Sequence, residues 1–328
     1  MATADPTVLR FLWWNAQDFA HYDKSRREAN RWPATARAFD EKLRRVGAVL
    51  HAGERHLGGL ELIGLCEVTR RAAERLRDEF FDGYRVVGGG GDEASFEALW
   101  LAAPGLPVQV QPPILAPDLP RHTRAMAVLD LLIRQSRIRF VACHWPPFEE
   151  ARRNRERIAE HLNHDLYDFL VAQVEAGMTR HAVVLGDLND EPFSTPRTHL
   201  HADRARGAAR RPLVYQDHDV RRVRLYNCAW RLLGEQRPHG VVFAPDQIDA
   251  AGTWYSEERD AWATLDHVIV SAGLLAEATP RLDEASVQAL TSRACTPSGD
   301  VPGKFTVSGG IFRGVSDHLP LLGRILLH

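Results

Sequence analysis

The sequence predicts an α/β fold, and three observations lead to that class. Short apolar segments alternate along the chain with longer segments whose apolar residues recur every three or four positions. Several of the short segments end directly in a polar residue. No internal repeat, low-complexity linker or break in composition divides the 328 residues, although length alone would favour about two domains.

The first half of the chain predicts strands and helices in alternation. The apolar, β-prone run 8–14 predicts a strand, and the spacing of Phe39, Leu43, Val46 and Leu50 predicts a helix over 33–52. Further strands are expected at 60–66, 84–87, 96–101 and 108–111, and a second amphipathic helix at 70–81.

The second half continues the pattern with longer elements. The segments 125–133 and 138–143 predict a hairpin around 134–137, and a long charged helix is expected over 149–176. Strands are expected at 182–185, 264–270 and 319–327, and the arginine-rich stretch within 200–223 reads as a surface loop.

The charge balance argues against a protein that coats DNA. The formal net charge is −2 and the sequence pI is about 6.7, so the chain has no global basic field of the kind that coats DNA. An enzyme that touches a few phosphates is not excluded. Lysine occurs only at 24, 42 and 304, so arginine, the better bidentate phosphate partner, supplies 38 of the 41 basic residues.

Cysteine spacing and the start of the chain predict the compartment. The four cysteines, Cys66, Cys143, Cys228 and Cys295, show no paired spacing that would indicate a disulfide framework or a zinc site. The first residues lack the basic and apolar regions of a signal peptide, and no run approaches the roughly 18 apolar residues of a membrane span. We therefore expect a soluble, cytoplasmic protein.

Polar residues at the ends of predicted strands form a candidate site. They are Asn15, Glu67, His144, Asp187 with Asn189, Asp266, and Asp317 with His318. Each has a structural alternative as a cap, a turn residue, an exposed strand end or an interface histidine. Together they would converge on one edge of an α/β sheet, where buried like charges repel unless a cation neutralises them.

In this order the residues resemble a known family. The set is Trp13-Trp14-Asn15, Leu65-Cys66-Glu67, Thr123-Arg124, Cys143-His144, Gly186-Asp187-Leu188-Asn189, Leu265-Asp266-His267 and Ser316-Asp317-His318. It is similar to the endonuclease/exonuclease/phosphatase superfamily. The resemblance implies a four-layer α/β sandwich, with two mixed β-sheets packed face to face and flanked by helices. Because the set runs from one end of the chain to the other, it also implies a single domain over 1–328.

The resemblance implies a metal and phosphate site. Glu67 would be the principal Mg²⁺ ligand, with Asn15 and Asp317 contributing, and Mn²⁺ is a possible substitute. Whether one metal ion or two would act is left open. Arg124 and Asn15 would contact the substrate phosphate.

The resemblance also implies catalytic roles. Asp187 and Asn189 would position or activate the attacking water. His318, held by Asp266, would act at the scissile phosphate as acid or base or stabilise the developing charge, and His144 would be a further phosphate contact. A carboxylate–histidine pair of this kind fixes the tautomer and orientation of the imidazole.

At two positions the chain departs from the motifs of particular branches of the family, and these differences make those branches less similar to it. The chain reads Ala-Cys-His144-Trp-Pro-Pro where apurinic-site endonucleases carry a tyrosine, and Thr-Leu-Asp266-His-Val where inositol polyphosphate 5-phosphatases carry Trp-Cys-Asp-Arg. Possible basic contacts for a polyanion are Arg152, Arg153, Arg155, Arg157 and the arginines of 204–211 and 221–224. Possible base-stacking residues are Trp145, Trp230, Trp254 and Trp262, although tryptophan is often a core residue.

These features predict a Mg²⁺-dependent phosphodiesterase, a nuclease with DNA or RNA as its substrate. A phosphatase or lipid phosphodiesterase on the same scaffold is the alternative. A non-catalytic binding protein that kept the fold is a third possibility. Protein partners are left open.

Overall fold

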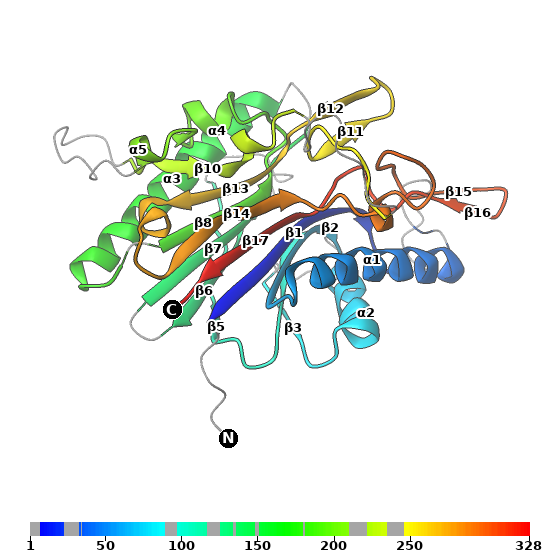
Figure 1. The fold of residues 1–328 in the computed structure, drawn as a ribbon, viewed down its shortest axis with the longest axis horizontal. Helices are drawn as coiled ribbons and strands as arrows, with labels where there is room; N and C mark the ends of the chain where they lie inside the picture. Colours follow the sequence, from blue (N-terminus) through cyan, green and yellow to red (C-terminus); the bar gives the residue numbers. More distant parts are fainter. Residues whose placement is uncertain are drawn as a thin grey trace.

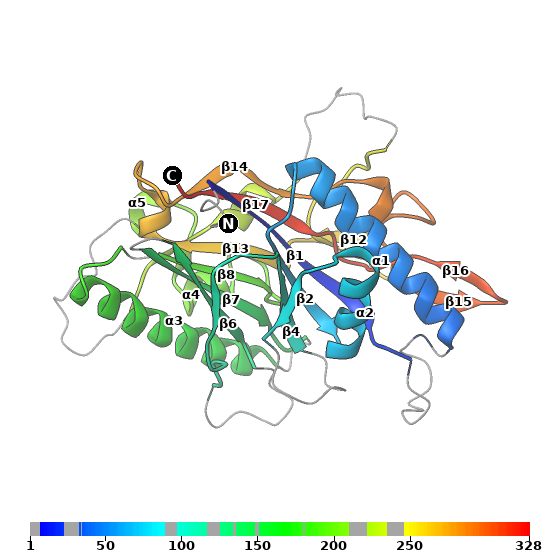
Figure 2. The same ribbon diagram turned by 90° about the horizontal axis from the view of Figure 1, so that it is seen from below.

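A computed structural model describes residues 7–22, 33, 35–88, 97–116, 125–133, 136–147, 151–179, 181–209, 222–234 and 246–328. Two large β-sheets stack face to face, and helices cover the outer face of each (Figures 1 and 2). This arrangement confirms the predicted four-layer α/β sandwich.

The first sheet contains six strands from both ends of the chain, in the order β14-β17-β1-β2-β4-β3. They are β1 (Val8–Phe19), β2 (Leu62–Val68), β3 (Arg85–Val87), β4 (Glu97–Ala102), β14 (Arg281–Ala289) and β17 (Leu321–Leu326). Strand β1 is parallel to β2 and antiparallel to β17, so the sheet is mixed.

The second sheet contains seven strands in the order β5-β6-β7-β8-β13-β10-β9. They are β5 (Val108–Val110), β6 (Ala127–Ile133), β7 (Ser136–His144), β8 (His181–Asp187), β9 (Ala202–Asp203), β10 (Leu225–Asn227) and β13 (Asp266–Ser271). Strands β7 and β8 are parallel, whereas β13 runs antiparallel to β8.

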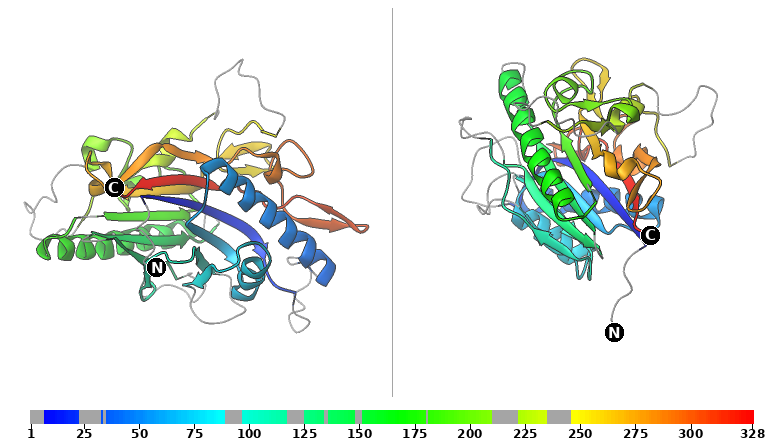
Figure 3. Two further views of the ribbon diagram at one scale, coloured as in Figure 1. Left: turned by 60° about the horizontal axis from the view of Figure 1, so that its bottom comes forward. Right: turned by 90° about the vertical axis from the view of Figure 1, so that its left-hand side faces the viewer.

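Helices form the outer layers. Helices α1 (Ala36–Leu57) and α2 (Arg70–Phe80) cover the first sheet, and α3 (Arg152–Glu175) covers the second (Figure 3). Shorter helices are α4 (Thr195–Thr198), α5 (Arg206–Ala209) and the 3₁₀ turns η2 (Cys228–Arg231), η3 (Ala272–Leu275) and η4 (Arg293–Cys295). No helix within the described ranges has the length and apolar character to cross a membrane.

Local sequence explains where the first helix begins and ends. The Thr35 hydroxyl accepts a hydrogen bond from the Ala38 N–H at 3.1 Å, which caps the start of α1. The helix ends at Gly58, whose φ of 74° is the left-handed conformation that glycine adopts without steric cost. The helix therefore runs five residues past the predicted end at 52.

Aromatic residues fill the space between the sheets. The Phe140 ring on β7 lies 6.5 Å from the Phe11 ring on β1 and 6.1 Å from the Trp100 ring on β4, both in edge-on arrangements. Edge-on packing is favourable for aromatic rings beyond the area that it buries. This contact fixes the two sheets against each other and so fixes the relative positions of the strand ends.

Two small hairpins project at the end of the sandwich. They consist of β11 (Trp254–Ser256) with β12 (Ala261–Ala263), and β15 (Thr306–Ser308) with β16 (Ile311–Arg313) (Figure 1). The sequence-based expectations contained no strands in these segments and none at β14.

Candidate active site

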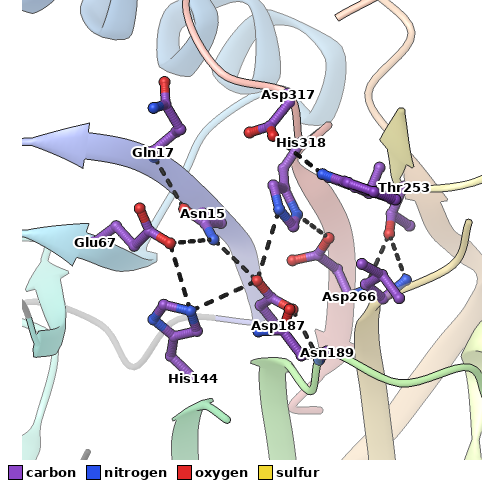
Figure 4. Close-up of polar contacts among 12 residues, drawn as sticks. Asn15, Gln17, Glu67, His144, Asp187, Asn189, Thr253, Asp266, Asp317 and His318 are labelled. Atoms are coloured by element: carbon purple, nitrogen blue, oxygen red, sulfur yellow. Dashed lines mark hydrogen bonds and ion pairs between the residues drawn. The ribbon is translucent and has the colours of Figure 1, made fainter. Parts of the chain in front are cut away.

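The candidate residues converge because of strand direction and register. Asn15 pairs with Cys66 across the parallel strands β1 and β2, and His144 pairs with Asp187 across β7 and β8. Asp266, the first residue of the antiparallel strand β13, also pairs with Asp187. The carboxyl ends of four strands and the amino end of β13 therefore meet at one edge of the sandwich (Figure 4).

Asp187 lies at the centre of the site and is 1% exposed. Its Oδ2 accepts a hydrogen bond from Asn15 Nδ2 at 2.9 Å and lies 3.6 Å from His318 Nε2 and 3.8 Å from His144 Nε2. Burial raises the pKa of Asp187 above its usual range, and the two histidines oppose that shift. One buried carboxylate thus connects side chains from both sheets.

Asn15 and Glu67 form the adjoining corner. Asn15 Nδ2 donates to Glu67 Oε1 at 3.2 Å, and Glu67 Oε2 accepts from the Asp18 N–H at 3.0 Å. Glu67 has a φ of 54°, and the ladder between β1 and β2 loses its regular register after Asn15. Such irregularities turn a side chain out of the sheet pattern and often occur next to functional sites.

His318 and Asp266 form a buried pair. Asp266 Oδ2 lies 2.8 Å from His318 Nδ1, and Asp266 Oδ1 accepts a hydrogen bond from the Trp13 indole at 3.1 Å. Burial alone would lower the pKa of His318, but the charges of Asp266 and Asp187 together raise it to about 10. The imidazole is therefore held as a cation that faces Asp187 with its other nitrogen.

Asp317 and Asp266 lie on opposite sides of the His318 side chain (Figure 4). Its Oδ2 accepts a hydrogen bond from the Trp254 indole at 3.1 Å and lies 3.6 Å from Lys304 Nζ. The Asp317 carbonyl also accepts from the Tyr255 N–H at 3.1 Å, so the β11–β12 hairpin is joined to the loop that carries Asp317 and His318.

His144 and Asn189 complete the group. His144 Nε2 lies 3.5 Å from Glu67 Oε1, so this histidine faces the acidic cluster and not the interior of its own sheet. Asn189 has a φ of 49°, donates its side-chain amide to the Trp145 carbonyl at 2.8 Å, and donates its backbone N–H to Asp187 Oδ1 at 2.9 Å. Asn189 thereby fixes the orientation of the Asp187 carboxylate.

Three buried residues that hold the site had no role in the sequence-based expectations. Trp13 orients Asp266, and Thr253 Oγ1 accepts the Asp266 N–H at 3.0 Å. Lys42, on α1, donates to backbone carbonyls next to the site. The signal available for Lys42 was a lysine three residues from Phe39, on the apolar face of a predicted helix.

The donor set fits a hard divalent cation. Glu67 supplies a carboxylate beside the Asn15 amide, and Asp187 and Asp266 place further negative charge nearby. In the part of the chain that the structure describes, no three or more His, Cys, Asp or Glu side chains gather as a metal-binding group. Mg²⁺ is usually held by only one or two carboxylates and retains several waters, and the Glu67 carboxylate is compatible with such an ion.

Arg124, the expected phosphate contact, lies outside the described residues. Arg155, expected in a basic track, is instead buried: it donates to the Pro146 carbonyl at 3.1 Å and lies 3.6 Å from Asp190. Arg206 pairs with Glu284 at 2.9 Å. The buried Arg155 holds the fold together, so the expectation that it contributes to a phosphate-binding track was wrong. The Arg206 side chain is 55% exposed, and for this residue the expectation stays a prediction.

The four tryptophans named as stacking candidates lie in different environments. Trp145 is 1% exposed and belongs to the core, so its proposed contact with a base is excluded. Trp230, Trp254 and Trp262 are partly exposed. Trp254 and Trp262 lie on the β11–β12 hairpin at the edge of the site.

Comparisons with known proteins identify the family. The model of the Endonuclease/Exonuclease/phosphatase family matches residues 12–318. No curated protein sequence matches the chain.

Solved structures share the fold at low sequence identity. A TDP2 from D. rerio, humanized by 14 mutations, has a TM-score of 0.53 and 12% identity, covering 98% of this chain and 99% of that chain. A mannosyl-6-phosphatase from Bacteroides thetaiotaomicron has a TM-score of 0.56 and 11% identity, covering 97% and 100%. Another family protein from Bacteroides thetaiotaomicron has a TM-score of 0.54 and 13% identity, covering 99% and 100%. With the family match over nearly its whole length, the chain belongs to the endonuclease/exonuclease/phosphatase family of phosphoester hydrolases, which generally depend on a divalent metal.

Proposed function

We propose that the protein is a Mg²⁺-dependent phosphodiesterase that cleaves DNA or RNA. The observation that carries the proposal is the buried Asp187 carboxylate, which faces Asn15, His144 and His318 from three different strands or loops. This arrangement places a base, two imidazoles and an adjoining carboxylate around one small volume, and such groups can activate water and stabilise charge in phosphoester hydrolysis.

In this proposal each residue of the site has a separate role in the reaction. Asp187, with one oxygen fixed by the Asn189 N–H, orients the attacking water and takes its proton. His318, held as a cation by Asp266, donates a hydrogen bond to a phosphoryl oxygen on which charge develops. A divalent ion held by Glu67 and Asn15, with Asp317 nearby, would supply Lewis-acid stabilisation of the phosphate. His144 would add a second contact to the same phosphate.

Aromatic side chains beside the site support a nucleic-acid substrate. Tyr255 and Trp262 lie next to each other on the β11–β12 hairpin, with ring centroids 5.3 Å apart, and both are partly exposed. The Trp254 ring lies 6.4 Å from the His318 ring. Aromatic faces close to a phosphate site can stack on nucleobases without sequence preference.

A phosphatase acting on a small phosphomonoester is the second candidate. It is favoured by the burial of Arg155, which removes one arginine from the basic surface that a long polyanion would use. The similarity in fold to a mannosyl-6-phosphatase agrees with this alternative but does not identify a substrate.

A single set of assays separates the candidates. Plasmid DNA, single-stranded DNA, RNA and small phosphomonoesters are incubated with the protein and Mg²⁺, Mn²⁺ or EDTA, with the Asp187→Asn variant as the control for contaminating activity. We expect cleavage of nucleic acid that EDTA and Asp187→Asn abolish. Release of inorganic phosphate from monoesters with no cleavage of DNA or RNA would replace the nuclease proposal by the phosphatase one.

A further inference from the structure

One buried lysine next to the site is not explained by packing. Lys42 lies on the apolar face of α1, between the buried side chains of Phe39 and Val46, and is 1% exposed. A buried amine costs free energy unless its hydrogen bonds are satisfied. Lysine is rare in this chain, because arginine supplies 38 of its 41 basic residues.

The Lys42 amine joins two segments that carry candidate metal ligands. Its Nζ donates to the Gln17 carbonyl at 2.8 Å and to the Val315 carbonyl. Gln17 lies two residues after Asn15, and Val315 lies two residues before Asp317. A single side chain from the outer helix layer thus binds the segment after Asn15 and the segment before Asp317.

The first of these segments has an irregular backbone that needs such support. Gln17 and Asp18 both have a positive φ, 46° and 49°, which costs free energy for residues other than glycine. This turn places the Asp18 N–H on Glu67 Oε2 at 3.0 Å and the Gln17 N–H on Asn15 Oδ1 at 2.9 Å. The orientations of Asn15 and Glu67 therefore depend on the turn whose carbonyl Lys42 binds.

The second segment is tied to the first by a further contact. Ser316 Oγ donates to the Asn15 carbonyl at 2.7 Å and accepts the His318 N–H at 3.0 Å. Lys42 binds the carbonyl immediately before Ser316, so the lysine and the serine join the same two segments at adjacent points. Burial lowers the pKa of Lys42 to about 7, and the charges of Asp18, Asp317 and Glu67 oppose that shift only in part.

We propose that Lys42 is a positioning residue of the divalent-metal site: by binding the Gln17 and Val315 carbonyls, it holds the Asn15–Glu67 corner and the Asp317 segment at the separation that the ion requires. The inference rests on the proposed metal-dependent function. Residues behind the ligands commonly change metal affinity about 10–100-fold when they are replaced.

The test measures metal binding directly. Mn²⁺ and Mg²⁺ are titrated into the metal-free full-length protein by calorimetry, and the hyperfine signal of free Mn²⁺ gives an independent spectroscopic readout. Lys42→Met keeps the length and apolar stem but removes the donors. We expect its dissociation constant to rise about 10-fold or more, while circular dichroism stays that of the folded protein.

A matched variant separates positioning from general loss of stability. Val46→Ala removes buried volume one turn further along the same helix and contacts neither carbonyl. It should lower the melting temperature and leave metal affinity at the wild-type value. Should Lys42→Met fail to fold, Lys42→Gln, which keeps an N–H donor at shorter reach, takes its place, and we expect weaker metal binding from it as well.

The outcomes are distinct. Unchanged or tighter metal binding by the folded Lys42 variant overturns the inference, and so does an equal loss of affinity in Val46→Ala. If the wild-type protein itself binds neither Mg²⁺ nor Mn²⁺, the metal requirement of the proposed function fails instead. Weaker binding confined to the Lys42 variants supports the inference.

Discussion

Asp187 shows how one side chain can be both structural and chemical. Its carboxylate is fixed by the Asn189 backbone and the Asn15 amide, and it faces two imidazoles at the same time. Asp187→Asn keeps the shape and removes the charge, although its amide NH2 would face one of the two donors that now bind the carboxylate.

We expect Asp187→Asn to lower kcat by about 10²–10⁴-fold, as loss of a general base does. The wild-type and variant proteins are compared in steady-state assays on whichever substrate class the first screen identifies. The melting temperature serves as the control for folding, and the assays are run well below it. Wild-type turnover in the variant would remove Asp187 from the catalytic role.

His318 predicts a dependence of stability on pH. Its pKa of about 10 in the folded protein lies above the ordinary value of 6.5, so its contribution to stability is complete below the ordinary value and is lost as pH rises through 10. Burial lowers the pKa of Lys42 to about 7, which acts in the opposite direction between 7 and its ordinary value of 10.5. The contribution of His318 must therefore be measured as the difference in free energy of unfolding between the wild type and a His318 variant.

The measurement is the free energy of unfolding in urea for the wild type and His318→Asn, in EDTA, near pH 6 and near pH 10. We expect the wild type to exceed the variant by more at the lower pH than at the higher one. A difference that is constant or that grows with pH would show that His318 is not held as a cation in the folded protein.

For single residues, the sequence predicted which polar side chains lie together in the candidate site. It did not predict which charged side chains are buried in contacts within the protein. Asn15, Glu67, His144, Asp187, Asp266 and His318 could be assigned because each directly follows or begins an apolar strand. Arg155 could not be recognised as buried, since its partner Asp190 lies far along the chain. The same holds for Trp13, whose indole binds Asp266 across 253 residues.

Among the elements, strands with continuous apolar runs were predictable and short or edge strands were not. Strands β2, β8 and β13 are buried on both faces, so they read clearly in the sequence. Strand β14 mixes charged, polar and apolar residues without regular alternation at the edge of its sheet, and β15 and β16 are mostly exposed, so no apolar pattern marks them. Their pairing depends on partners that local sequence does not show.

Strand β2 also contains a glycine whose packing against neighbouring strands affects a residue of the candidate site. Gly64 pairs with Trp13 on one side and Trp100 on the other, and an added Cβ would lie 2.9 Å and 2.8 Å from these two rings. Because Trp13 binds Asp266, crowding at Gly64 would displace an indole that the site uses.

We expect Gly64→Ala to lower the free energy of unfolding by about 1–3 kcal/mol through overpacking, as measured by urea denaturation. Gly299→Ala is the matched control, because an added Cβ there meets nothing within 4 Å, and its effect should stay within about 0.5 kcal/mol. Equal stability of the two variants would show that the indoles can move apart without cost.

The whole molecule is built so that neither half of the chain completes a sheet. Strand β1 lies between β2 and β17 in the first sheet, and β8 lies between β7 and β13 in the second. The site takes Asn15 and Glu67 from the first half of the chain and Asp266 and His318 from the second. This interleaving favours one domain over the two that length alone suggests.

We therefore predict a single cooperative unfolding transition in calorimetry, with equal calorimetric and van't Hoff enthalpies. The loss of ellipticity and of tryptophan fluorescence should follow the same curve. Two resolved transitions, or a stable proteolytic fragment corresponding to either half, would instead indicate two independently folding units.

The antiparallel pairing of β1 with β17 sets Val8 opposite Leu326, at the end of the sheet remote from Asn15 and Asp317. The first and last strands thus begin and finish side by side, facing away from the chemistry (Figure 1). A fluorophore or a surface tether attached beside Val8 or Leu326 would therefore lie away from the candidate active site and leave that edge of the sandwich accessible.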